Sequence, residues 1–220
     1  MKNDQLSPLS RLFAVVPAAG RGRRFAEAGG GGSKLLALVP NTKGLTVIGR
    51  LLSWLERLPL DGIYVSALAT DSTLRDEISR YAAKSVLFDE RPTEMRDSVE
   101  AILSHITARE NPTVADGWLL IPADHAPPSI AFGRVLIAGW HAAPERIVTP
   151  IFAGRTGHPT LFPWHLSREL SSYPRTVGVN NLRVQHPELL LAIPTTDPAV
   201  LHDIDTPEDL EVVPTRNILD

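Results

Sequence analysis

The sequence predicts a single α/β domain whose mostly parallel, Rossmann-like sheet carries a late flap of antiparallel strands. Short runs rich in β-branched residues alternate with longer stretches that have the apolar spacing of helices, as in sheets covered on both faces. The 220 residues are 43% hydrophobic, which is ample for one continuous core. No internal repeat is visible, so we expect an N-terminal tail over residues 1–11 and one domain over residues 12–220.

The alternation is clearest in the first half of the chain. Four buried strands are predicted there, at Leu12–Pro17, Ile63–Leu68, Ser85–Phe88 and Trp118–Pro122. Three helices are predicted between them, at Val47–Leu58, Ser72–Ala83 and Met95–Arg109. Strand–helix repetition of this kind implies right-handed crossovers and hence parallel neighbours.

In the last third of the chain the strand–helix alternation is less regular, which predicts the antiparallel flap. Arg146–Phe152 and Pro159–Phe162 have the character of strands, joined by a turn that contains two glycines. Leu189–Pro194 predicts one more strand. Pro207–Val212 predicts a final helix, because Thr206 is a good N-cap and proline is favoured at the first helical position.

Composition and charge exclude several classes of protein. The 22 basic and 25 acidic residues give a net charge of −3, whereas a nucleic-acid-binding protein needs a basic face. The chain has no cysteine, which excludes disulfides and thiolate chemistry. The apolar run Leu12–Ala19 is too short to span a membrane and lacks the context of a signal peptide. We therefore expect a cytoplasmic protein that acts on small molecules.

A glycine-rich loop follows the first predicted strand. Its small residues, and the cationic residues after them, are Ala18, Ala19, Gly20 and Gly22, then Arg23, Arg24 and Lys34. Small residues let the backbone approach a ligand closely, and unpaired N–H groups in such a loop can bind phosphates. Arginine and lysine supply the matching charge. The loop therefore predicts an anion site.

Three familiar sites do not fit the spacing. A dinucleotide-binding loop needs a third glycine where this chain has Phe25, and a Walker A loop needs glycine where Ser33 precedes Lys34. The seven histidines show no zinc-binding spacing.

Sequence motifs along most of the chain resemble those of GT-A-like (MobA-like) nucleotidyltransferases. The loop matches their signature of two small residues, glycine and a later arginine, followed by lysine. The run 15–20 (Val-Val-Pro-Ala-Ala-Gly) and the run 96–99 (Arg-Asp-Ser-Val) resemble methylerythritol-phosphate cytidylyltransferases. The runs 154–159 (Gly-Arg-Thr-Gly-His-Pro) and 203–210 (Asp-Ile-Asp-Thr-Pro-Glu-Asp-Leu) reproduce hallmarks of molybdenum-cofactor cytidylyltransferases.

This resemblance implies a role for each matching residue. Arg24 and Lys34 are expected to be catalytic, holding the triphosphate and the leaving pyrophosphate. The residues expected to contact the nucleotide are Ala18, Ala19, Gly20, Gly22, Arg23, Arg96 and Ser98. Those expected to line the acceptor pocket are Gly157, His158 and Pro159. For Ser98, a purely local role on its helix is an equally good interpretation.

Three aspartates are the expected metal ligands. Asp124 directly follows a predicted strand, and ligands bind at the carboxyl ends of parallel strands. Asp203 and Asp205 alternate along an extended stretch, so both side chains can point to one side. Carboxylates of this kind suit Mg²⁺, which is the expected cofactor. A turn or helix cap remains an alternative for Asp124, and stabilisation of the following helix for Asp205.

The implied reaction is attack by a substrate phosphate on the α-phosphorus of CTP, which transfers CMP and expels pyrophosphate. A phosphate monoester has a second pKa of about 6, so no strong general base is required. The second half of the chain implies molybdopterin cofactor as the acceptor, with a molybdoenzyme or a second copy of the chain as protein partner.

Departures from both family branches leave other acceptors open. The stretch 124–128 lacks the arginine of methylerythritol-phosphate enzymes, and Thr176–Asn181 lacks an acid and an arginine of the molybdenum branch. The alternatives are 2-C-methyl-D-erythritol 4-phosphate as acceptor, a guanylyltransferase acting on a small phospho-acid, and a non-catalytic nucleotide-binding module used in maturation.

Overall fold

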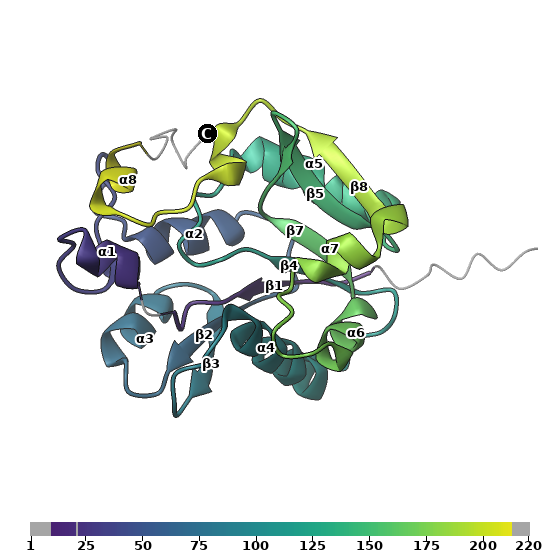
Figure 1. Ribbon diagram of the computed structural model, residues 1–220, viewed down its shortest axis with the longest axis horizontal. Helices are drawn as coiled ribbons and strands as arrows, with labels where there is room; N and C mark the ends of the chain where they lie inside the picture. Colours follow the sequence, from purple (N-terminus) through teal and green to yellow (C-terminus); the bar gives the residue numbers. More distant parts are fainter. Residues whose placement is uncertain (1–9, 21, 213–220) are drawn as a thin grey trace, which may run out of the picture.

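The structure is a computed structural model that describes residues 10–20 and 22–212 (Figure 1). Within these ranges eight strands form one sheet in the order β3–β2–β1–β4–β7–β5–β6, and β8 also pairs with β5. Their bounds are β1 Leu12–Val16, β2 Gly62–Leu68, β3 Ala83–Phe88, β4 Gly117–Leu120, β5 Ile147–Phe152, β6 Arg155–Thr156, β7 Thr160–Pro163 and β8 Leu190–Pro194.

The first four strands are parallel, with β1 between β2 and β4. β7 runs antiparallel to both β4 and β5, while β8 is parallel to β5. The antiparallel strands that the sequence predicts are therefore present. They belong to the central sheet, where β7 is buried along its whole length between β4 and β5.

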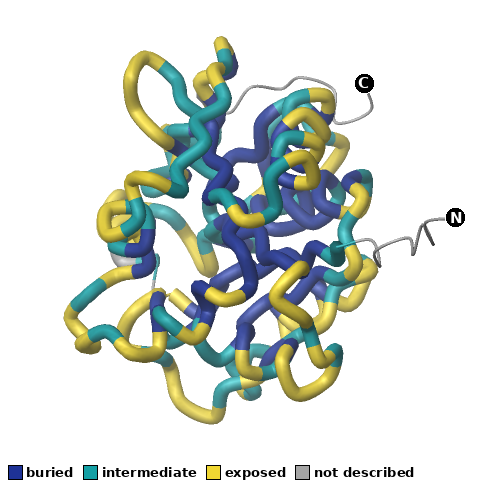
Figure 2. Tube along the Cα trace, turned by 90° about the vertical axis from the view of Figure 1, so that its right-hand side faces the viewer, coloured by how far each residue is buried: buried dark blue, intermediate teal, exposed yellow. Residues whose placement is uncertain are grey.

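Helices cover both faces of the sheet and create two cores, and the centre of the molecule is buried (Figure 2). One face packs against α2 (Val47–Leu55), α3 (Ser72–Ile78) and α5 (Ile130–Ala142). The other packs against α4 (Met95–Glu110), α6 (Leu166–Ser172) and α7 (Asn181–Gln185). Side chains along β1 alternate between the two cores, as the period of two in a strand requires.

Local signals in the sequence explain where several helices begin. The hydroxyl of Thr46 caps α2 and that of Ser129 caps α5, each accepting a backbone N–H from the first turn. Glu94 and Asp97 form a reciprocal capping box at the start of α4. No helix among residues 10–20 and 22–212 is long and apolar enough to cross a membrane.

Two short helices lie at the edge of the sheet where β1 and β4 end. α1 (Arg23–Glu27) follows the glycine-rich loop, and α8 (Pro207–Val212) follows the aspartate-rich segment. Figure 1 shows them side by side, although more than 170 positions separate them in the sequence. This edge is where the candidate site lies.

Candidate active site

A buried serine of β2 holds the loop after β1 in place. Ser66 Oγ accepts hydrogen bonds from the backbone N–H groups of Ala18, at 2.7 Å, and Ala19, at 3.2 Å. These two amides are therefore occupied within the protein, which corrects the expectation that they are unpaired donors for phosphate. Gly22 then adopts a left-handed conformation, with φ 57°, and turns the chain into α1.

Arg91 also holds this loop in place, through the loop's carbonyl groups. It lies just beyond the end of β3, and its Nη1 donates to the carbonyls of Ala19, at 2.8 Å, and Gly20, at 2.7 Å. The sequence prediction did not include Arg91. The signal that could have found it is its place after a parallel strand, at the edge of the sheet where ligands bind.

Cations from the N-terminal segment meet carboxylates from the middle and the last part of the chain. Lys34 Nζ lies 2.5 Å from Asp124 Oδ2 and 3.5 Å from Asp205 Oδ1. Arg24 Nη1 lies 2.6 Å from Asp205 Oδ2. Only 10% of the Lys34 side chain is exposed, whereas that of Arg24 is 77% exposed, so Lys34 is the more firmly held of the two.

Asp203 is held by a histidine. His125 is buried, and its Nδ1 lies 2.7 Å from Asp203 Oδ1. Burial raises the pKa of Asp203, but the hydrogen bond from His125 and the nearby positive charge, that of Lys34 included, together lower it below its ordinary value. The backbones of residues 124 and 204 are also joined, since the N–H of Ile204 donates to the carbonyl of Asp124 at 2.9 Å.

The segment before α8 is organised by Asp209. Its Oδ2 accepts from the backbone N–H groups of Asp205, at 2.8 Å, and Thr206, at 2.7 Å. Burial raises the pKa of Asp209, but these amides lower it overall. The predicted helix start at Thr206 is confirmed, and the carboxylate of Asp209 adds the hydrogen bonds that orient Asp205.

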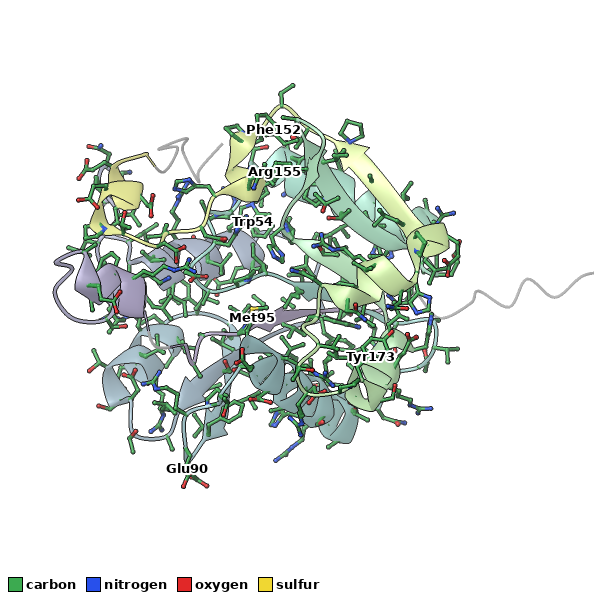
Figure 3. All side chains as sticks on the ribbon, viewed as in Figure 1. Trp54, Glu90, Met95, Phe152, Arg155 and Tyr173 are labelled. Carbon is green, nitrogen blue, oxygen red and sulfur yellow. The ribbon has the colours of Figure 1, made fainter. Side chains whose placement is uncertain are left out.

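A cleft of about 720 Å³ opens between the loop, the carboxylates and the start of α4. Its lining residues include Gly20, Gly22, Arg24, Lys34, Met95, Ser98, Asp124 and Asp205. Figure 3 labels Met95, whose side chain is exposed at the start of α4. An adjoining pocket of about 270 Å³ adds Ala18, Ala19, Asp71 and Arg91. The structure thus brings most of the expected nucleotide-contacting residues around one opening.

Arg96 does not face this cleft, which corrects the expectation that it binds nucleotide. The residue is 3% exposed, and its guanidinium donates to the carbonyls of Leu170, Tyr173, Pro174 and Val177. It also pairs with Glu100 at 2.8 Å. Its helical spacing to Val99, Leu103 and Ile106 places it on the buried face of α4, a signal visible in the sequence. The side chain of Arg23 lies outside the described residues.

The expected acceptor loop lies against the end of η3 (Pro198–Leu201). A Cβ on Gly157 would lie only 1.9 Å from the carbonyl oxygen of Val200, so the close backbone approach requires glycine. The ring of His158 meets that of His125 edge to face, with centroids 5.3 Å apart. The side chain of His158 is half-buried by area, and desolvation lowers its pKa to about 3, so it is neutral at physiological pH.

The three aspartates do not form the expected metal cluster. Across residues 10–20 and 22–212, no group of three or more histidine, aspartate or glutamate side chains could hold a metal ion by itself. The reason is that Lys34 bridges Asp124 and Asp205, while His125 holds Asp203. Asp124 Oδ1 and Asp203 Oδ2 have no hydrogen-bond partner among the described residues. Two carboxylates still fit Mg²⁺, which commonly takes one or two together with waters and substrate phosphates.

An open α/β sheet with a small-residue loop, cations and carboxylates at one edge defines a nucleotide-handling protein. More narrowly, the chain belongs to the family described as MobA-like NTP transferase domain, whose profile matches residues 14–189. It is therefore a nucleotidyltransferase of the MobA-like family. No curated protein matches the chain.

Solved structures with the same fold cover nearly the whole chain. Rv0371c from Mycobacterium tuberculosis H37Rv is 23% identical with a TM-score of 0.70, and the match covers 92% of this chain and 97% of that one. A nucleotidyl transferase from Methanothermobacter is 20% identical with a TM-score of 0.70, covering 92% and 96%. A 4-diphosphocytidyl-2C-methyl-D-erythritol synthase is 16% identical with a TM-score of 0.70, covering 97% and 100%. At these identities the likeness establishes the fold.

Proposed function

We propose that this chain transfers CMP from CTP to a phosphorylated small-molecule acceptor such as molybdopterin cofactor and releases pyrophosphate. The observation that carries the proposal is the bridge from Lys34 to Asp124 and Asp205 beside the glycine-rich loop. It supports the proposal because side chains that suit a triphosphate and carboxylates that suit a divalent cation lie at one cleft, and nucleotidyl transfer requires both.

In this proposal the protein aligns two anions and neutralises charge that moves onto the leaving group. Lys34 and Arg24 turn from their carboxylate partners to the β- and γ-phosphates, which are the better-matched anions once nucleotide is bound. The acceptor phosphate is already largely dianionic at neutral pH, because its second pKa is about 6. Its oxygen attacks the α-phosphorus, the bond to the pyrophosphate oxygen breaks, and pyrophosphate leaves with the electron pair.

Asp124 and Asp203 would hold a divalent cation, proposed to be Mg²⁺, through the carboxylate oxygens that have no protein partner. When bound, such a cation neutralises phosphate charge and acts as a Lewis acid. The structure of Rv0371c has also been determined in complex with manganese. Asp205 pairs with Arg24 and Lys34 before nucleotide binds, and in this proposal it keeps the two side chains beside the glycine-rich loop until the phosphates arrive.

The choice of acceptor rests on sequence motifs, so the alternatives are tested side by side. Methylerythritol 4-phosphate is an alternative acceptor, as is a small phospho-acid that receives GMP. The experiment incubates the protein with each of the four ribonucleoside triphosphates, Mg²⁺ or Mn²⁺, and each acceptor, and measures pyrophosphate release. We expect release with CTP and molybdopterin cofactor. Nucleotide binding without release for any acceptor would instead favour the non-catalytic module.

Lys34→Ala is the variant that tests the mechanism. We expect turnover to fall on the order of a hundredfold or more, because the contact to phosphate strengthens as charge develops on the leaving group. Lys43→Ala, in the loop before α2, is the matched control and is expected to keep wild-type turnover. Turnover in Lys34→Ala within a few fold of wild type would contradict this mechanism.

A further inference from the structure

Arg183 is a half-buried cation on α7 whose partners in the described part of the chain are all neutral. Its Nη2 donates to Asn180 Oδ1 at 2.9 Å, and its Nη1 makes a long contact of 3.5 Å with Thr149 Oγ1. A guanidinium carries five N–H donors, so most of them have no partner among residues 10–20 and 22–212. No carboxylate in that part of the chain forms an ion pair with it.

This arrangement is costly for the folded protein unless an anion compensates for it. Burial lowers the pKa of Arg183, and no neighbouring carboxylate opposes that shift. Arg96, a fully buried arginine on α4, is bound by Glu100 and four carbonyls. A charge removed from water is normally paired. Within the described part of the chain, half-buried Arg183 lacks the anionic partner that its position calls for.

The surroundings of Arg183 connect it to the expected acceptor loop. Thr149 Oγ1, which receives the contact from Arg183, donates to the carbonyl of Gly157 at 3.1 Å. The positive charge of Arg183 also helps to lower the pKa of His158. From His158 the chain of contacts continues through the ring of His125 to Asp203, which is one of the two proposed cation ligands. Because His158 is neutral, Arg183 supplies positive charge beside the loop around Gly157.

We propose that Arg183 receives the phosphate group of the acceptor, with neutral His158 and the loop around Gly157 shaping the space beside it. This inference rests on the proposed function, which supplies the second substrate. A planar guanidinium binds two phosphate oxygens at once, which orients the attacking oxygen as well as attracting it.

The test measures binding of inorganic phosphate to the full chain by calorimetry. All proteins carry Lys34→Gln, so that the glycine-rich loop loses its buried cation and Asp124 and Asp205 repel phosphate there. Arg183→Gln is compared with Arg168→Gln, which removes the same charge from an exposed position on α6. We expect phosphate affinity to fall about tenfold in Arg183→Gln, the scale of a lost charge-assisted bond, and to stay unchanged in Arg168→Gln.

Two further measurements keep the result interpretable. The Nε–Hε NMR signal of Arg183, assigned by its loss in Arg183→Lys, should shift as phosphate is added, and this readout does not depend on whether Arg183→Gln folds. Acetate should bind far more weakly than phosphate. Equal phosphate affinity in the two glutamine variants, an unmoved Arg183 signal, or equal binding of acetate would each overturn the inference.

Failure of this inference is distinguishable from failure of the proposed function. Binding of CTP is measured separately in the chain with native Lys34. Both proposals are supported if Arg183→Gln binds CTP as tightly as wild type does but lowers the affinity for phosphate in the Lys34→Gln background. If wild type does not bind CTP, the proposed function is wrong whatever happens at Arg183.

Discussion

Lys34 shows how a single side chain can connect three distant parts of a sequence. It begins the short η1 helix (Lys34–Leu36), and its ammonium lies between a carboxylate that follows β4 and one that precedes α8. Lys34 compensates the charge of one carboxylate, and Arg24, which also pairs with Asp205, compensates that of the other. In the proposed function, the phosphates of the nucleotide compete with these carboxylates for both cations.

Arg91 allows a prediction at the same scale, because it binds the loop without belonging to it. Arg91→Ala removes the two bonds to the carbonyls of Ala19 and Gly20. We expect KM for the nucleotide to rise about fivefold, or ~1 kcal/mol, with little change in kcat, since the loop loses order before binding.

Arg75→Ala is the matched control, because Arg75 also donates from an exposed position to a single backbone carbonyl, that of Ala69. Steady-state kinetics with varied nucleotide give both parameters. A fall in kcat of the size expected for Lys34→Ala would mean that Arg91 acts on the reacting phosphates themselves.

At the scale of elements, the turn before α8 is held together by the carboxylate of Asp209. Asp209→Ala leaves the N–H groups of Asp205 and Thr206 without their acceptor. We expect a loss of about 1 kcal/mol in the free energy of unfolding, typical of a lost N-terminal cap, together with reduced turnover because Asp205 is no longer oriented.

The pH dependence of this effect has a definite sign. The folded pKa of Asp209 lies below its ordinary value of 3.8. Its stabilisation is therefore fully present above that value and is lost as the pH falls through the lower folded pKa. Urea unfolding of wild type and Asp209→Ala should give curves that converge at acid pH, whereas Glu208→Gln, on an exposed neighbour, should show no such convergence.

At the scale of the whole molecule, Arg96 joins the two halves of the chain. It reaches from α4 to the carbonyl of Leu170 in α6 and to three carbonyls in the loop between α6 and α7. Arg96→Met leaves those buried carbonyls without their donor and Glu100 with only exposed Arg175 as a partner, so we expect a loss of about 3–5 kcal/mol in the free energy of unfolding. Denaturant unfolding checks it, with exposed Arg109→Met as control. A stable variant with weakened nucleotide binding would restore the role first expected for Arg96.

The strand–helix alternation and the motifs predicted much of the fold and the cleft. The four early strands, the last helix and the meeting of Lys34 with Asp124 follow from spacing and from the sheet-edge rule. The place of β7 between β4 and β5 could not be predicted, because strand order is set by packing over long distances. Helix α5 was also missed, although it is largely apolar and capped by Ser129.

The site was less predictable than the fold, because residue identity does not show which polar groups pair with one another in the folded protein. Ser66 occupies the amides of Ala18 and Ala19, and Lys34 occupies two of the three expected metal ligands. The residues of each pair lie far apart in the sequence, so no local motif indicates that they meet. Arg183 illustrates the reverse case, since its proposed role rests on the lack of a carboxylate partner among residues 10–20 and 22–212, which only the structure shows.

The central position of β1 also has a kinetic consequence. Its neighbours β2 and β4 come from far along the chain: residue Leu12 bonds to a group 49 positions away, and Arg11 to one 105 positions away. Loop-closure entropy must be lost before either contact contributes stability. Refolding from denaturant should therefore be slow compared with helical bundles of equal stability, and the chain will expose unpaired strand edges for much of that time.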